Sequence, residues 1–369
     1  MSNDLDKRND SLDNNKLYNR ISELIELARQ KVASVVNLTM VHTYFEVGRM
    51  IVEDEQKGKD RAEYGKAVLK ELSTRLTGRF GKGFSEQNLR NMRQFFIVYT
   101  DRDLSIRQTP SSGLENRVNQ SSKVKSYDFS LNWSHYLILM RIENIAERNF
   151  YEIEAKNENW SERQLSRQYH SSLYERLALS RNKEEVIKLA SEGHTVVKPE
   201  DILKNPLSLE FLGMEEKDSY TESDMEHAII SKLQQFLLEL GKGFLFEARQ
   251  KRFTFDDEHY FVDLVFYNRL LQCYVLIDLK TDKLTHQDLG QMQMYVNYYD
   301  RYEKREFEKP TIGILLCKKK TTALVELTLP EDAHIYASEY TLYLPDKKLL
   351  QQKLTEWIIE FDDLGKDQD

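Results

Sequence analysis

Apolar side chains in the first half of the chain recur every three or four residues, the spacing of one face of a helix. Five segments show this pattern: 17–56, 61–76, 85–99, 133–155 and 161–179. Ser85 begins the third of these segments, and a serine in this place typically caps the first turn of a helix. Residues 101–127 are rich in Ser, Asn and Gln and predict an exposed loop, and residues 1–15 predict a disordered tail. We therefore expect a helical domain over 16–180.

After residue 222 the pattern changes to strands mixed with helices. Ser223 and Glu226 match a capping box, which predicts a helix that ends at Gly241. The next segments predict three strands, a helix and a buried strand: 244–255, 260–267, 272–280, 287–302 and 311–317. A short turn joins the second and third strands into a hairpin. A sheet flanked by helices is the closure that buries these strands.

This pattern divides the chain into two domains joined by a linker. Residues 181–221 contain two of the prolines and predict the linker, and residues 222–345 predict the second domain. Residues 346–369 predict an acidic tail with a short helix. The length of 369 residues agrees with two domains, because single compact domains seldom exceed about 250–300 residues. The expected fold class is an all-helical domain followed by an α/β domain with a central mixed sheet.

Composition excludes several classes of protein. No apolar run approaches the roughly 18 residues of a membrane span, and the polar start of the chain lacks the core of a signal peptide. We therefore expect a cytoplasmic protein with no membrane contact. The two cysteines are too few for a disulfide framework. The glycine-rich turn 78–83 lacks the Gly-Lys-Ser/Thr of a phosphate loop, and we expect no nucleotide cofactor.

A basic stretch stands out against the net charge of −8. Residues 61–100 hold eight Lys or Arg against three Glu. The candidates for nucleic-acid contact are Lys82, Arg90, Arg93 and Gln94, because such side chains bind phosphates and base edges. A helix-turn-helix-like arrangement would present them to DNA. The alternatives are a solvated helix face and a helical domain that mediates dimerisation.

The candidate chemistry lies in the two strands of the predicted hairpin. Asp263 stands inside the apolar run 260–267, and a buried carboxylate needs a partner or a cation. Asp278 and Lys280 are two residues apart, so on a strand they point to the same face. If Asp263 meets them across the hairpin, the resulting acidic site suits Mg²⁺ or Mn²⁺, which take oxygen ligands. The alternative is a structural ion pair between Asp and Lys.

The order Asp263, then Asp278-Leu279-Lys280, resembles the signature of PD-(D/E)XK nucleases. Longer blocks resemble the YhcG-type family of bacterial PD-(D/E)XK nuclease-domain proteins: VDLVFYNRLLQCYVLIDLK, LGQMQMYVNYYD and IGILLCKKK. Two further blocks resemble the helical N-terminal domain of that family: EYGKAVLKELSTRLTGRFGKGFSEQNLRNMRQFF and LNWSHYLILMRIENIAERNFYEIEA. The resemblance covers about residues 17–345, and it implies a restriction-endonuclease-like fold for the second domain.

The resemblance also implies roles for the matching residues of the hairpin. Asp263 and Asp278 would hold Mg²⁺ or Mn²⁺, and Lys280 would serve the attacking water. Asp278 stands where the family usually has Glu, so its shorter side chain is expected to shift the metal geometry.

Residues on the two neighbouring helices also match the family. Glu226 would be the helix acid that helps to ligate metal; the alternative is that it only completes its own capping box. Gln291 and Tyr295 are four residues apart and match the Gln-x-x-x-Tyr feature of the RecB-like branch, whose helix touches substrate. The alternative for this pair is plain helix packing.

Together these inferences predict a Mg²⁺-dependent DNA nuclease, cutting as an endonuclease or exonuclease, whose helical domain binds DNA or forms a homodimer. The alternative is an inactive or weak nuclease fold that serves as a nucleic-acid-binding or assembly module. The intact set Asp263, Asp278 and Lys280 favours the enzyme. The resemblance implies a cellular role in bacterial DNA repair or phage defence.

Overall fold

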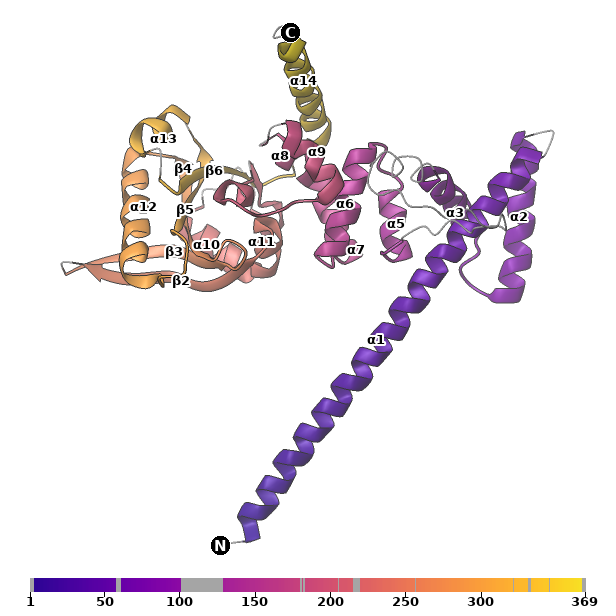
Figure 1. Ribbon diagram of the computed structural model, residues 1–369, viewed down its shortest axis with the longest axis horizontal. Helices are drawn as coiled ribbons and strands as arrows, with labels where there is room; N and C mark the ends of the chain where they lie inside the picture. The colour runs from indigo at the N-terminus through magenta and orange to yellow at the C-terminus, as the bar shows by residue number, and fades with distance from the viewer. Residues whose placement is uncertain are drawn as a thin grey trace, which may run out of the picture. The chain divides into compact units, whose positions relative to one another are not determined.

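The computed structural model of the protein describes residues 3–57, 61–100, 129–179, 181, 183–204, 206–214, 220–255, 257–320, 322–330, 333–344 and 346–366. The predicted loop 101–127 lies outside these residues. The chain divides into two compact units (Figure 1): unit 1 is Met1–Arg148 with Ala155–Glu162, and unit 2 is Asn149–Glu154 with Arg163–Asp369. None of the described helices combines the length and apolarity that crossing a membrane requires.

Unit 1 is built from helices: α1 (Asn3–Lys57), α2 (Arg61–Phe80), α3 (Glu86–Tyr99), α5 (Trp133–Leu139) and most of α6 (Ile145–Asn157). Its core contains a cluster of aromatic rings: Phe45, Phe95, Tyr99, Phe129 and Tyr136. The backbones of α1 and α3 approach closely at Gly48, where an added Cβ would lie 2.0 Å from the carbonyl oxygen of Met92. Only glycine allows this approach.

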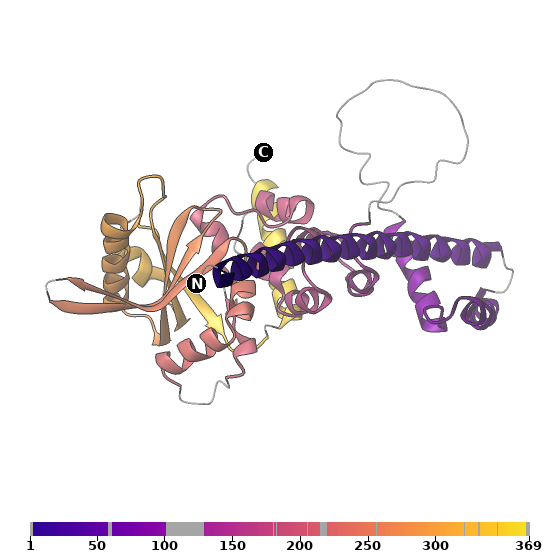
Figure 2. The ribbon, with the colours of Figure 1, turned by 90° about the horizontal axis from the view of Figure 1, so that it is seen from below.

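Local capping chemistry explains where the helices of unit 1 begin. Ser85 caps α3 as predicted, because its Oγ accepts a hydrogen bond from the Asn88 N–H at 3.2 Å. The segment predicted as one helix over 133–155 is two helices, since Asn144 starts the second by accepting from the Glu147 N–H at 3.1 Å. Residues 3–15, expected as a disordered tail, are the first turns of α1, an uninterrupted helix in Figure 2. The sequence before Gly48 contains neither Gly nor Pro, so it holds no residue that would interrupt α1.

Unit 2 contains a six-stranded sheet, and its strands are β1 (Leu207–Ser208), β2 (Phe244–Phe255), β3 (Glu258–Asn268), β4 (Cys273–Lys283), β5 (Ile312–Lys319) and β6 (Ile335–Thr341). The strand order is β1-β6-β5-β4-β3-β2. Strands β2, β3 and β4 pair antiparallel, whereas β5, β6 and β1 continue the sheet in parallel. This mixed sheet confirms the expected fold class, and the pairing of β3 with β4 confirms the predicted hairpin.

Helices cover both faces of the sheet (Figure 1). Helices α10 (Glu222–Ser231) and α11 (Leu233–Leu240) pack on one face, and α12 (His286–Tyr298) and α13 (Thr322–Thr328) pack on the other. A π-helical turn over Tyr299–Glu303 extends α12. Along β4, Ile277 and Leu279 point toward α10 and α11, and Leu276 points toward α12. Side chains alternate along a strand, so Asp278 and Lys280 belong to the α12 face.

The rest of unit 2 differs from expectation at several places. Part of the predicted linker belongs to the core: β1 pairs with β6, and Leu207, Leu209 and Leu212 are buried with α10 and α11. The predicted helix over 161–179 divides into α7 (Glu162–His170) and α8 (Leu173–Ala178), because Ser172 adopts a left-handed φ of 55°. Two further helices are α9 (Lys183–Glu192) and α14 (Lys347–Lys366). The predicted short helix of the tail is thus a helix of 20 residues.

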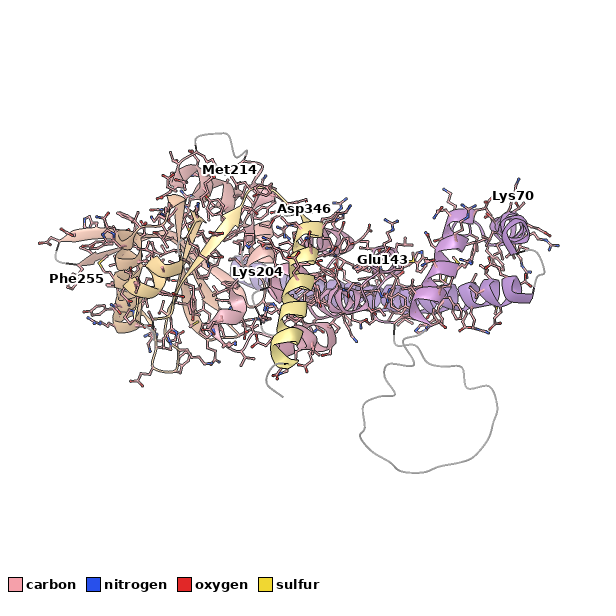
Figure 3. The ribbon with its side chains drawn as sticks, turned by 90° about the horizontal axis from the view of Figure 1, so that it is seen from above. Lys70, Glu143, Lys204, Met214, Phe255 and Asp346 are labelled. Carbon is pink, nitrogen blue, oxygen red and sulfur yellow. The ribbon has the colours of Figure 1, made fainter. Side chains whose placement is uncertain are left out.

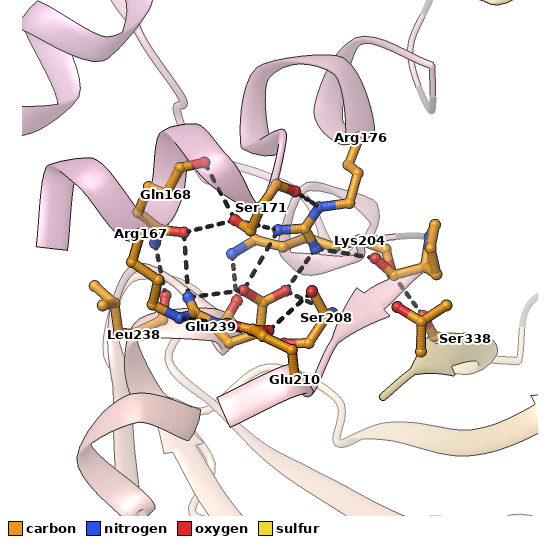
Figure 4. Close-up of polar contacts among 12 residues, drawn as sticks. Arg167, Gln168, Ser171, Arg176, Lys204, Ser208, Glu210, Leu238, Glu239 and Ser338 are labelled. Carbon is orange, nitrogen blue, oxygen red and sulfur yellow. Dashed lines mark hydrogen bonds and ion pairs between the residues drawn. The ribbon is translucent and has the colours of Figure 1, made fainter. Parts of the chain in front are cut away.

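A buried ionic cluster holds α7 and α8 to the sheet (Figure 4). Glu239 on α11 pairs with Arg176 at 2.6 Å and with Arg167 at 3.2 Å, and it accepts a hydrogen bond from the Ser208 N–H at 3.0 Å. The side chains of Arg176 and Glu239 are fully buried. Burial alone would raise the pKa of Glu239, but the cations around it lower that pKa to about 2. Glu239 therefore remains ionised and bridges helices that lie far apart in the sequence.

Candidate active site

Asp263 lies where β3 and β4 separate. The two strands pair from Leu264 to Asn268 of β3, and this ladder stops one residue before it reaches Asp263. Instead, Oδ2 of Asp263 accepts a hydrogen bond from the Leu279 N–H at 2.8 Å. The carboxylate thus takes the place of a strand carbonyl, which brings the acid to the middle of β4 and satisfies a backbone donor.

Asp278 and Lys280 stand together on β4, as their spacing predicts. The Nζ of Lys280 lies 2.9 Å from Oδ2 of Asp278, and it also lies 3.5 Å from Glu222 and 3.9 Å from Asp288. Burial and the adjacent Asp263 raise the pKa of Asp278 above its usual value, although Lys280 opposes the shift. Burial alone would lower the pKa of Lys280, but Asp278 and then Glu222 raise it above its usual value. The lysine is therefore a permanent cation beside two neighbouring carboxylates.

Glu226 does not complete a capping box. The N-cap of α10 is Thr221 rather than Ser223, and Asp224 is the acid that bonds back to it. The capping alternative for Glu226 is therefore wrong, because the cap lies two residues earlier than the sequence pattern indicates. The Glu226 side chain is 5% exposed and points instead toward β2, where its Oε1 lies 3.3 Å from Nε of Arg249.

Gln250 on β2 connects Glu226 to Asp263. Its Nε2 donates to Oε2 of Glu226 at 2.5 Å and to Oδ1 of Asp263 at 2.9 Å. Sequence reasoning missed this residue. The available signal was the hairpin register: Phe255 pairs with Glu258 across the turn, and counting back from that turn sets Gln250 opposite Asp263. Gln250 adopts a positive φ of 46°, a strained conformation that sites of function often retain.

Helix α12 adds Gln291 and Tyr295, which form a pair as their spacing predicts. The amide of Gln291 donates to the hydroxyl of Tyr295. Burial raises the pKa of Tyr295 to about 12; the Gln291 hydrogen bond opposes this, and the charges of Asp278 and Asp263 add to it. The Tyr295 hydroxyl therefore lies in the field of the carboxylates and retains its proton at neutral pH.

The four candidates for nucleic-acid contact belong to unit 1. Lys82 and Gln94 are exposed. Arg90 forms an ion pair with Glu86 at 3.1 Å, and Arg93 forms one with Glu55 at 2.7 Å. Arg90 and Arg93 are thus each paired with a carboxylate of unit 1 itself.

The chemistry of the donors suits a hard divalent cation. In the part of the chain that the structure describes, no three His, Cys, Asp or Glu side chains are placed to hold a metal as one set. Mg²⁺ commonly needs only one or two protein carboxylates, because water and substrate phosphates complete its octahedron. Asp263 and Asp278 supply this minimum, and Glu226 approaches them through Gln250. The site therefore fits Mg²⁺ or Mn²⁺ with phosphate oxygens as further ligands.

Two protein families match the chain. The YhcG PDDEXK nuclease domain matches residues 200–355, and the DUF1016 N-terminal domain matches residues 20–176. The chain is also similar to "Putative nuclease YhcG" of Escherichia coli (strain K12). That match has 38% identity over 360 residues and covers 94% of this chain and 95% of that protein.

Two solved structures resemble a part of the chain. One is a repair endonuclease from Pyrococcus abyssi, with a TM-score of 0.23 and 19% identity. The other is an EndoMS complex with double-stranded DNA, with a TM-score of 0.24 and 17% identity. Each match covers 36% of this chain and 50% of the solved chain, so the likeness extends over half the length of those proteins.

Proposed function

The chain belongs to the YhcG family, which joins a DUF1016 N-terminal domain to a YhcG PDDEXK nuclease domain, and from this premise we propose a metal-dependent nuclease that hydrolyses DNA. The observation that carries the proposal is the meeting of Asp263, Asp278 and Lys280 where β3 and β4 separate. Two adjacent carboxylates beside one cation suit phosphodiester hydrolysis, in which negative charge develops on a phosphate. We extend the proposal to a role in DNA repair or phage defence on the family resemblance alone.

Each residue of the site has a distinct task in this proposal. Asp263 and Asp278 would hold Mg²⁺ or Mn²⁺, which supplies Lewis acidity toward the scissile phosphate and acidifies a bound water. Lys280 remains protonated, so it orients the attacking water and stabilises charge on the phosphate rather than accepting a proton. The Tyr295 hydroxyl retains its proton and can donate a hydrogen bond to substrate. Gln250 fixes Asp263 relative to Glu226.

The test is cleavage of single-stranded, duplex and branched DNA and of RNA in Mg²⁺, Mn²⁺ or EDTA. Lys280→Met keeps the side-chain length and removes the charge, and Lys283→Met makes the same change at an exposed position of β4. We expect metal-dependent DNA cleavage that falls at least about a hundredfold in Lys280→Met and is unchanged in Lys283→Met. Equal cleavage by both variants contradicts the proposed role of Lys280. Binding without cleavage under every condition supports the alternative of a nucleic-acid-binding or assembly module.

We further propose that unit 1 mediates a homodimer through α1. Six large apolar side chains are exposed among those that the structure describes on this helix: Leu24, Ile25, Val32, Val35, Val36 and Met50. At 100° per residue they fall within about 120° of the helix circumference, the width of a stripe that usually packs against another element. A second copy of α1 would cover this stripe, since exposed apolar patches commonly mark protein interfaces. Lys82 and Gln94 are exposed and remain as proposed DNA contacts of unit 1.

Molar mass in solution tests the dimer. A Val32→Asp, Val35→Asp double variant should halve the mass measured by light scattering, because two charges would enter the apolar stripe. Val197→Asp changes an exposed valine of unit 2 and should leave the mass unaltered. An unchanged mass in the double variant excludes the α1 dimer. Weaker DNA binding by Lys82→Ala and Gln94→Ala, with the mass unaffected, would instead favour DNA contact as the task of unit 1.

A further inference from the structure

A groove lies beside α12, next to the carboxylate site, and none of the residues proposed for catalysis lines it. It encloses about 360 Å³ between the β2–β3 hairpin and α12 with its π-helical extension. The residues of its lining that matter here are Phe253, Phe255, Asn297, Tyr298, Arg301 and Tyr302. Figure 3 labels Phe255 near the end of the hairpin that projects from the sheet.

The groove is built around a series of aromatic rings. Phe253 stacks on Tyr298 with ring centroids 4.0 Å apart and an interplanar angle of 18°. Phe253 also stacks on Tyr260, its partner across the hairpin, with centroids 5.4 Å apart and an angle of 24°. Tyr302 follows Tyr298 at 5.2 Å. At the open side, Phe255 is 53% exposed and Tyr302 is 64% exposed. Two large rings thus present their surface to solvent beside rings that are already stacked.

The aromatic series begins directly beside the candidate active site. The Phe253 ring meets the Tyr295 ring edge to face, with centroids 5.6 Å apart. Tyr295 in turn receives the hydrogen bond of Gln291 and lies in the field of Asp263 and Asp278. A strand whose phosphate lies at these carboxylates would therefore extend its neighbouring nucleotides along the rings.

The polar lining of the groove favours a nucleotide over an apolar peptide. Arg301 is exposed and forms no ion pair with any residue that the structure describes, so its guanidinium can meet a phosphate. Asn297 is exposed one helical turn earlier; its Oδ1 accepts a hydrogen bond from Gln293 at 3.3 Å, and its amide N–H groups can meet a base edge. Aromatic faces together with a cation are the combination by which proteins bind single strands, because every base has a stackable face. A duplex keeps these faces inside its own stack.

From these observations we infer that the groove binds unpaired bases, so that the substrate reaches the carboxylates as a single strand or a single-stranded flap. This inference rests on the proposed nuclease function, and it names the form of the substrate. Phe255 and Tyr302 stack on bases, and Arg301 contacts the phosphate between nucleotides.

Binding measured in EDTA tests the inference without cleavage. Fluorescence anisotropy would compare a labelled oligo(dT) with a blunt duplex, using wild type, Phe255→Ala, Tyr302→Ala and Arg301→Ala. The matched control is Phe307→Ala, since Phe307 is 72% exposed and does not line the groove. Each ring variant should weaken single-strand binding about 5- to 150-fold, the range given by stacking of one base. Duplex binding and the Phe307→Ala control should change less than about twofold.

The outcomes separate the groove from the nuclease proposal. Equal binding of oligo(dT) by the ring variants and the wild type overturns the groove, even if the wild type cleaves DNA. Equal losses for duplex and single strand overturn it as well, because stacking on unpaired bases would not act on a blunt duplex. A lower molar mass of Phe255→Ala or Tyr302→Ala would show an interface between copies instead. Selective loss of single-strand binding supports the groove, even if no cleavage is found and the nuclease proposal fails.

Discussion

Replacing Gln250 by Leu tests whether the amide between two carboxylates sets the metal affinity of the site. Gln250 donates to Oε2 of Glu226 at 2.5 Å and to Oδ1 of Asp263 at 2.9 Å. Leu has a similar volume but no donor, so the change removes both hydrogen bonds. The two acids then lose the group that holds them in one orientation.

The expected magnitude follows from these two contacts. A hydrogen bond to a charged group contributes about 1.5–3 kcal/mol, and Gln250→Leu removes two of them. Part of this loss is recovered when the carboxylates rotate toward solvent or Arg249. Partners that orient metal ligands typically change metal affinity by about 10- to 100-fold, or about 1.4–2.7 kcal/mol. We therefore expect the Mg²⁺ concentration for half-maximal cleavage to rise by about 10- to 100-fold.

The assay is the initial rate of DNA cleavage over a titration of Mg²⁺. At saturating Mg²⁺ the rate should fall less than about tenfold, because Gln250 orients a ligand and lies outside the proposed set Asp263, Asp278 and Lys280. Gln235→Leu, at an exposed position of α11, is the control for loss of an amide in the same unit. An unchanged Mg²⁺ midpoint, with a rate reduced equally at all concentrations, would refute the reasoning and assign Gln250 to the chemical step.

Three further predictions concern the stability of the fold. Arg176→Met should lower the free energy of unfolding by about 3–5 kcal/mol in urea denaturation, because it leaves Glu239 buried without its 2.6 Å partner. The control Arg75→Met removes an exposed ion pair and should lower the free energy of unfolding by less than about 1 kcal/mol. Similar losses in the two variants would contradict this expectation. Burial, with Arg181 and Lys204 nearby, lowers the pKa of His194 to about 3. Between pH 6.5 and pH 3 the unfolded chain therefore binds a proton at His194 that the folded chain does not bind. The free energy of unfolding should fall over this range by up to about 1.4 kcal/mol per pH unit as the pH is lowered. His194→Gln should flatten this pH dependence, and an unaltered slope would argue against it. Gly48→Ala should destabilise unit 1 by about 1–3 kcal/mol in thermal unfolding. The control Gly78→Ala should not destabilise it, because an added Cβ there meets nothing within 4 Å. Equal effects of the two changes would show that α1 and α3 can move apart to accept the methyl group.

The sequence predicted the parts of the fold that local chemistry controls. Ser85 caps α3 because its own side chain reaches a backbone N–H three residues later, and no distant contact is needed. The strand 244–255 is predicted to the residue, since its flanking turns and composition mark both ends. Asp278 and Lys280 share a face because the side-chain period of a strand is two. Family resemblance then supplied the chemical interpretation of these residues.

Long-range contacts decided the features that the sequence pattern missed or misplaced. The sequence pattern indicated Ser223 as the cap of the helix, whereas the structure uses Thr221 and leaves Glu226 facing Gln250. Residues 207–208 show no strand pattern of their own. They form the short strand β1 because β6 provides a parallel partner.

The sequence by itself determined the order of elements, the class of fold and the acidic residues that define the family. Tertiary structure decided which of those residues meet. Gln250 joins the site through the register of the hairpin, and Glu239 gathers Arg167 and Arg176 from helices about 70 residues earlier in the chain. The physical reason is that caps and periodicity depend on neighbouring residues, whereas register and buried charge pairing depend on packing between segments that are distant in sequence.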